Sequence, residues 1–170
     1  MTTAVKPIPD GFHTITPSLI VKDAEKAIEF YRQALGAEVR DVHKTPDGSK
    51  VVHAELKIGN SIIFVNDEFP DMGACAPADA TANSVTFNLY VEDADASFAQ
   101  AVEAGATSVM PVAEMFWGDR WGIATDPYGY KWSFCTHVRD VTPEEVERAS
   151  KEYLEQECGK VEAKAEATEA

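Results

Sequence analysis

Hydrophobic and polar residues alternate along two stretches of the chain that begin 70 positions apart. Ile15–Ala24 reads ITPSLIVKDA and Val85–Ala94 reads VTFNLYVEDA, with identical residues at five of the ten positions. A period of two predicts strands with one face on a core and a more polar opposite face. Both stretches end in Val-x-Asp-Ala and lead into a helical pattern, which favours a duplicated unit over a chance match of two strands.

Each predicted unit continues in the same way after its first strand. Asp23 and Asp93 stand at helix N-cap positions, and Gly36 and Gly105 are natural helix stops. Apolar residues recur at helical spacing between them, over residues 24–35 and 94–102. Strands are then expected at 38–43, 50–58 and 61–65 in the first unit, and at 108–112, 121–125 and 131–135 in the second. Each unit therefore has the order β-α-β-β-β.

These units predict an α+β fold in which two βαβββ modules form a U-shaped mixed sheet around a cleft, followed by a C-terminal helix. The expected organisation is an N-terminal segment (1–11), a single domain (12–140), a helix (141–157) and an acidic disordered tail (158–170). Within the domain we expect module one (about 12–66), a linker (67–83) and module two (about 84–140). Thr142-Pro143-Glu144-Glu145 marks the start of that helix.

The composition limits which partners the protein is expected to bind and where in the cell it is expected to lie. A net charge of −14 argues against nucleic acid and against anionic membranes, because both repel an acidic protein. No apolar run is long enough to span a bilayer and the N-terminus lacks a signal-peptide core, so we expect a cytoplasmic protein. The three cysteines are odd in number and lack metal-ligand spacing, which disfavours a disulfide framework or a cysteine-based metal site.

Ionisable residues with catalytic chemistry lie on one strand. His53 and Glu55 point the same way along the strand at 50–58, and the repeat argument directs them into the cleft. They are candidate catalytic residues that would act as a general acid/base pair. Alternatively, they could be two metal ligands, a substrate anchor, or a plain hydrogen-bonded pair without a function. The polar faces of the two first strands supply candidate substrate-binding residues: Thr16, Ser18, Thr86, Asn88 and Tyr90.

The Gly-bounded hairpin at 118–134 and the tryptophan just before it supply the other candidates. Arg120 is a candidate clamp for an anionic substrate, with a surface ion pair as the alternative, and Trp117 and Trp121 form a candidate aromatic wall. Asp126-Pro-Tyr-Gly129 has the residues of a type I turn. The remaining histidines, at 13, 43 and 137, are more typical of surface or capping positions.

The motifs TPSLIVKDAEKAIEFYRQALGAE, NLYVEDADASF and FWGDRWGIATDPYGYKW, together with THVRDVTPEE, resemble the vicinal oxygen chelate superfamily, and most closely its PhnB-like branch. This superfamily includes glyoxalases, bleomycin-resistance proteins and extradiol dioxygenases, and the resemblance covers residues 7 to about 148. It implies two βαβββ modules around a small-molecule cleft, and a homodimer.

Metal-dependent members of that superfamily imply four ligand positions, which match Thr16, Glu55, Thr86 and Ser133 in this sequence. Only Glu55 is a good ligand for a divalent metal, because neutral hydroxyls bind such ions poorly. We therefore expect no bound metal or other cofactor, and keep a divalent metal held through His53 and Glu55 as the alternative. Tyr130 also departs from the branch, which more often has His there.

Three functions follow from the resemblance. The first is a small-molecule-binding cleft protein without the usual metal site, in which Ser133 and the residues named above bind the ligand. The second is a divalent-metal-dependent lyase, isomerase or dioxygenase. The third is a resistance protein that sequesters a drug without altering it. The sequence leaves open whether the protein is an enzyme, because this fold hosts many activities.

Overall fold

The computed structural model describes residues 5–78 and 83–168. Residues 1–4 of the predicted N-terminal segment and residues 79–82 of the predicted linker lie outside this range. The first module consists of β1 (Ser18–Val21), α1 (Ala24–Leu35), β2 (Glu38–Lys44), β3 (Val51–Ile58) and β4 (Ser61–Asp67), followed by the short helix η1 (Pro70–Met72). The second consists of β5 (Thr86–Tyr90), α2 (Ala94–Glu103), β6 (Thr107–Glu114), β7 (Asp119–Thr125) and β8 (Lys131–His137).

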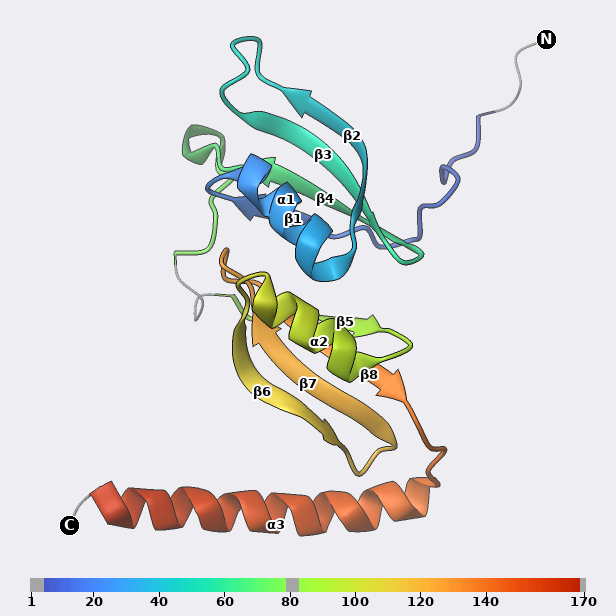
Figure 1. The fold of residues 1–170 in the computed structure, drawn as a ribbon, viewed down its shortest axis with the longest axis vertical. Helices are drawn as coiled ribbons and strands as arrows, with labels where there is room; N and C mark the ends of the chain where they lie inside the picture. The colour runs from blue at the N-terminus through green and yellow to red at the C-terminus, as the bar shows by residue number, and fades with distance from the viewer. Residues whose placement is uncertain (1–4, 79–82, 169–170) are drawn as a thin grey trace.

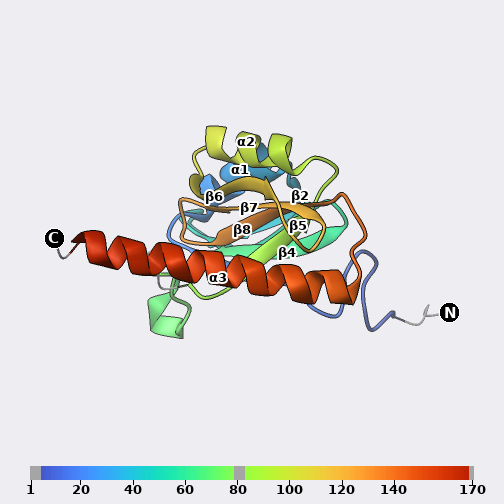
Figure 2. The same cartoon turned by 90° about the horizontal axis from the view of Figure 1, so that it is seen from below.

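The predicted α+β fold is confirmed, with its strands arranged as two four-stranded mixed sheets. Their strand orders, β1-β4-β3-β2 and β5-β8-β7-β6, are equivalent. β1 runs parallel to its neighbour β4, and β5 runs parallel to its neighbour β8. Asp23 and Asp93 cap α1 and α2 by accepting hydrogen bonds from Lys26 N and Ala96 N. α1 and α2 both cover the same side of the paired sheets, and neither lies on the opposite side (Figures 1 and 2). We call this other side the open face.

The apolar sides of the two sheets share one core with the two helices. Leu19, Leu56 and Val65 are fully buried in the first module, and Phe134 is 1% exposed in the second. The helices contact one another, and Gln100 Nε2 donates to Gln33 O at 2.7 Å. The modules therefore pack as a single unit, as expected for a duplicated fold that buries its apolar faces together.

Aromatic residues of the β7–β8 turn close the free edge of β1. The Tyr130 hydroxyl accepts a hydrogen bond from Ile20 N and donates one to Ile20 O, both at 2.9 Å. The Tyr31 hydroxyl of α1 donates to Asp126 Oδ2 at 2.8 Å. These bonds satisfy backbone groups that no strand pairs, and they fix the turn of module two against module one.

The C-terminal helix is longer than the sequence suggested. α3 spans Pro143–Thr168, beyond the predicted end at 157 and into the segment predicted to be a disordered tail. The physical reason is the abundance of Ala, Glu and Lys in this segment, which have high helix propensity. Its start is as predicted: Thr142 and Glu145 form a reciprocal capping box, with bonds of 3.0 and 3.3 Å. Figure 1 shows α3 running past the second sheet.

No helix within residues 5–78 and 83–168 combines the length and the apolar character needed to cross a membrane.

Candidate functional site

The candidate catalytic residues of module one lie on the open face. Along β3, Ala54, Leu56 and Ile58 are buried, whereas His53 and Glu55 are partly exposed on the opposite side. Because alternate residues of a strand point to opposite faces, the buried set lies under α1 and the polar set faces away from it. The predicted common orientation of His53 and Glu55 is therefore present in the structure.

Glu55 is the centre of a small group of charged and aromatic side chains. Its carboxylate lies 3.9 Å from His53 Nε2 and 4.0 Å from Arg40 Nη1 of β2, and its side chain is 23% exposed. The Phe64 ring of β4 lies 4.7 Å from the His53 ring, measured between centroids. The Glu55 carboxylate is thus partly shielded from solvent and lies near the Arg40 guanidinium and the His53 imidazole. The Phe64 ring lies beside this group.

The N-terminal segment lies against this group. The Phe12 ring is 6.0 Å from the Phe64 ring, and the Arg40 guanidinium lies 5.9 Å from the Phe12 centroid, within cation–π range. His43 of β2 stacks on His53 at 6.3 Å, so it too belongs to this face. Sequence analysis assigned His43 to an ordinary surface position, because the register that pairs β2 with β3 is not visible in the sequence.

The open face of module two is centred on Ser133. This residue of β8 is fully buried, and its hydroxyl donates to the Asn88 side chain of β5, its direct neighbour across the parallel pair. Ile123 of β7 lies opposite Ser133 on the other side. The structure therefore brings together two of the candidate ligand-binding residues, Asn88 and Ser133, and the Ser133 hydroxyl is already hydrogen-bonded to the Asn88 side chain.

The four candidate residues of the first strands, Thr16, Ser18, Thr86 and Asn88, lie at different depths along β1 and β5. Ser18 lies opposite Phe64 in the same way that Asn88 lies opposite Ser133. Thr16 precedes β1, and Thr86 is the first residue of β5, opposite Lys131. Of these four candidate residues, Ser18 and Asn88 therefore lie nearest the centre of their strands, and Thr16 and Thr86 lie at or before the strand starts.

Arg120 and Trp121 lie on opposite faces of β7. The Arg120 guanidinium forms two hydrogen bonds with Asp95 of α2, at 2.6 and 2.7 Å, and this pairing raises the pKa of Arg120. The structure thus places Arg120 on the helix-covered side, in the ion pair that was the alternative interpretation. Trp121 lies across from Cys135, and its ring is 5.7 Å from that of Trp117. The two tryptophans form an aromatic pair without the arginine.

A second ionisable group lies on the open face, and sequence reasoning named its Tyr90, missed Asp119 and assigned His137 to a surface or capping position. Asp119 is only 5% exposed, and it accepts hydrogen bonds from the Tyr90 hydroxyl at 3.1 Å and from His137 Nδ1 at 2.7 Å. The hydrogen bond to Asp119 raises the pKa of His137, and a second one to Asp140 acts in the same direction. The signal for this group is the cross-strand pairing of Asp119 with His137, which requires the β7–β8 register.

The side chains at the centre of the open face do not suit a divalent metal. In the part of the chain that the structure describes, no three His, Cys, Asp or Glu side chains gather closely enough to hold a metal ion. The four positions implied by the sequence contribute one carboxylate and three hydroxyls, and the Ser133 hydroxyl is bonded to Asn88. Neutral hydroxyls bind divalent ions poorly, so this donor set differs from that of the usual metal centre.

A cavity of about 380 Å³ lies at the seam between the two sheets. Its lining includes Thr86 and Asn88 from β5, Ile62 from β4, and Pro17 and His13 from the segment before β1. Two predicted ligand-binding residues, Thr86 and Asn88, thus border a real cavity. His53, Glu55 and Ser133 are not among its lining residues, so the group around Glu55 lies outside this cavity.

Comparisons with known proteins identify the family and agree with the fold. The family model described as Glyoxalase/Bleomycin resistance protein/Dioxygenase superfamily matches residues 11–134. An uncharacterized protein of Mycobacterium tuberculosis is 38% identical over 138 residues, which cover 79% of this chain and 81% of the relative. The X-ray structure of an Arabidopsis thaliana gene product is 30% identical, with a TM-score of 0.55 and coverage of 74% of this chain and 96% of that one. TioX from a Micromonospora species, at 24% identity, has a TM-score of 0.59 with coverage of 74% and 99% and supports the fold alone.

Proposed function

The chain belongs to the glyoxalase/bleomycin resistance protein/dioxygenase superfamily, and we propose that it binds a small organic molecule on its open face without the metal site typical of many superfamily members. Family membership supports the small-molecule class of ligand, but one fold hosts many reactions. The choice among those reactions therefore depends on the side chains of this chain.

The observation that carries the proposal is the position of Glu55. Its partly exposed carboxylate lies between the His53 imidazole and the Arg40 guanidinium, next to the Phe64 ring. A ligand with an apolar ring could pack on Phe64, while its polar group exchanges hydrogen bonds with Glu55 and His53. If the bound molecule reacts, these two residues are the groups placed to transfer protons.

Replacing Glu55 with glutamine tests this proposal. The change keeps the side-chain shape and removes the charge, so we expect ligand binding to weaken by about tenfold or more, with little change in thermal stability. Ligands come from a thermal-shift screen of metabolites, and isothermal titration then compares wild type with Glu55→Gln. Glu144→Gln, an exposed change on α3, is the matched control.

The same experiment separates the three functions. Metal analysis of the purified protein should find no stoichiometric nickel, zinc, iron or manganese; such a metal, lost in Glu55→Gln, would overturn the proposal. Mass spectrometry of the ligand after incubation separates an enzyme from a sequestering protein, because only an enzyme changes the ligand mass. A Glu55→Gln variant that binds every hit as tightly as wild type would place the ligand elsewhere.

We further propose that the protein is a homodimer in the cytoplasm. Dimers are common in this superfamily, and the acidic composition disfavours membranes and nucleic acid as partners. Light scattering coupled to gel filtration should give about twice the chain mass of 18.5 kDa. A monomeric mass across the micromolar range would contradict the dimer, and it would leave the open-face site unaffected.

A further inference from the structure

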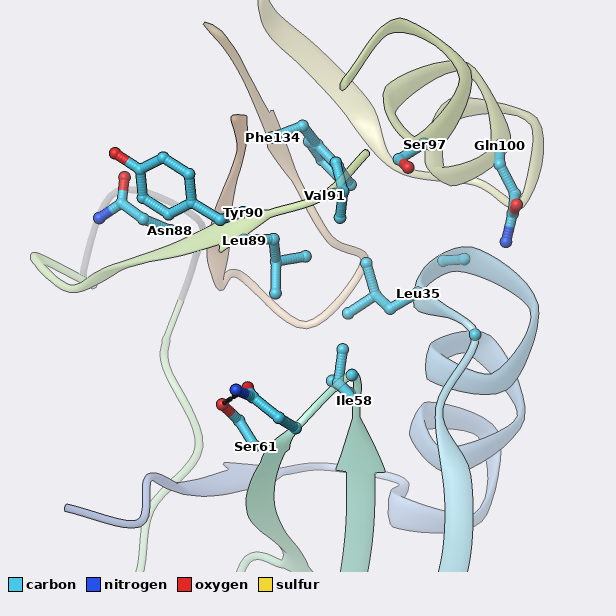
Figure 3. Close-up of a pocket in the computed structure, with 14 residues that line it drawn as sticks. Leu35, Ile58, Ser61, Asn88, Leu89, Tyr90, Val91, Ser97, Gln100 and Phe134 are labelled. Atoms are coloured by element: carbon cyan, nitrogen blue, oxygen red, sulfur yellow. Dashed lines mark hydrogen bonds between the residues drawn. The ribbon is translucent and has the colours of Figure 1, made fainter. Parts of the chain in front are cut away.

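A larger cavity, of about 600 Å³, lies at the seam where β5 faces the β3–β4 turn and the end of α1. Figure 3 shows Leu35, Ile58 and Leu89 directed toward one another across this space, with Ser97 and Gln100 of α2 at one side. Among the described residues that line it, none carries a charged side chain. The cavity therefore combines an apolar centre with neutral polar groups, as ligand pockets commonly do.

The duplicated fold contains a second copy of this location, where aromatic rings occupy the space between the elements and a smaller cavity of about 300 Å³ borders Tyr128. In that copy, β1 and α1 of module one face the β7–β8 turn of module two. Tyr128 packs on Phe30 and Tyr31 of α1, with ring centroids 6.1 Å apart in both pairs. Tyr130 reaches the edge of β1, where its hydroxyl bonds to both Ile20 N and Ile20 O. An aromatic cluster thus occupies the position that is hollow in the other half.

Small or polar residues replace that cluster around the cavity. Counted from the N-caps Asp23 and Asp93, the positions of Ala27, Phe30 and Tyr31 in α1 hold Ser97, Gln100 and Ala101 in α2. Phe64 and Ser133 are equivalent positions, because they lie opposite the equivalent residues Ser18 and Asn88. The residue three positions before Ser133 is Tyr130, and the residue three positions before Phe64 is Ser61. Three aromatic rings present at one site are therefore missing at the other, which explains why the cavity exists.

The free edge of β5 offers the same backbone groups that Tyr130 binds on β1. Val91 N donates to Cys135 O at 2.9 Å, which shows that odd-numbered residues of this strand bond toward β8. Tyr90, the counterpart of Ile20, therefore directs its N–H and C=O away from β8 and toward the cavity that it lines. A hydroxyl at this point could accept from the Tyr90 N–H and donate to the Tyr90 C=O.

We propose that this cavity binds a neutral aromatic alcohol, a phenol of one or two rings. The ring system occupies the space between Leu35, Ile58 and Leu89, and the hydroxyl takes the place on Tyr90 that the Tyr130 hydroxyl takes on Ile20. An anionic ligand is disfavoured, because the lining lacks a positive charge and the protein carries a net charge of −14. This site is separate from the group around Glu55 on the open face.

Binding of three probes tests the ligand class. We expect 4-phenylphenol to bind with saturable one-to-one stoichiometry in isothermal titration, and biphenyl and biphenyl-4-carboxylate each to bind about tenfold more weakly or worse. In amide NMR spectra, 4-phenylphenol should shift the Tyr90 resonance. If none of the probes saturates, the site is overturned; if the hydrocarbon binds as well as the phenol, recognition of the hydroxyl is overturned.

Refilling the cavity tests its location. Ser61→Tyr places a tyrosine at the counterpart of Tyr130, and it should weaken 4-phenylphenol binding by about tenfold or more. Ser108→Tyr, an exposed change on the edge strand β6, is the matched control and should bind like wild type. Gln100→Phe, at the counterpart of Phe30, should also weaken binding. Unchanged affinity in both Ser61→Tyr and Gln100→Phe would overturn the proposal, whereas lost affinity in Glu55→Gln alone would assign the probe to the open face.

Discussion

Replacing Asp126 with alanine is expected to lower the free energy of unfolding by about 3–5 kcal/mol. The Asp126 side chain is almost completely buried and accepts four hydrogen bonds. Oδ2 accepts from the Tyr31 hydroxyl at 2.8 Å and from Trp132 Nε1 at 2.9 Å, while Oδ1 accepts from Tyr128 N at 2.8 Å and Tyr130 N at 2.9 Å. Alanine would leave these donors without their acceptor at the joint between the modules.

Asparagine at position 126 should be nearly as harmful, although it matches the shape of aspartate. Both Asp126 oxygens accept two bonds each, so an amide nitrogen in either place would face donors. Burial raises the pKa of Asp126, and the donors around it oppose that shift. The expected loss distinguishes an obligatory acceptor from a side chain that merely fills space.

Urea unfolding followed by circular dichroism measures this effect. Asp47→Ala is the matched control, because Asp47 also accepts bonds from turn neighbours, Thr45 and Ser49, but is exposed to water that can replace them. Tyr31→Phe should lose part of the stability that Asp126→Ala loses, since it removes one of the four donors. Equal stability of Asp126→Ala and Asp47→Ala would show that the buried carboxylate does not join the modules.

Asp126 also shows how far the sequence could predict the fold. The Asp-Pro-Tyr-Gly pattern identified a turn, because those residue types favour turn geometry on their own. Repeated alternation and paired N-caps identified both modules for the same reason: the signals are local. The long-range partners of Asp126 could not be predicted, since Tyr31 lies 95 positions away and meets it only after the modules dock.

For the candidate site, the sequence predicted which face of a strand a side chain lies on, but not which side chains of other elements it contacts. His53 and Glu55 share a face because a strand has a period of two, and this holds wherever the strand lies. Arg120 pairs with Asp95 because α2 packs on β7, a contact that no pattern in the hairpin reveals. The group of Tyr90, Asp119 and His137 spans three strands, and it becomes visible only through their register.

The hairpin that carries Trp117 and Trp121 depends on one glycine, which leads to the second large expected effect. Replacing Gly118 with alanine should lower the free energy of unfolding by about 3 kcal/mol or more. Gly118 has a φ of +97°, and a Cβ there would lie 2.0 Å from the carbonyl oxygen of Arg139 and 2.7 Å from Val141 Cγ2. Backbone must therefore move, in addition to the strain of the left-handed conformation.

The backbone around Gly118 has little freedom to make that movement. Its carbonyl accepts hydrogen bonds from both Val138 N and Arg139 N, at 3.0 Å each, which hold the chain after β8 against the loop before β7. Gly48→Ala separates the two contributions, because Gly48 has a φ of +73° with open space around it, so only the conformational cost of about 1–2 kcal/mol applies. Thermal and urea unfolding of both variants measure the difference. If Gly118→Ala were no less stable than Gly48→Ala, the close approach of residues 118 and 139 would not constrain this loop.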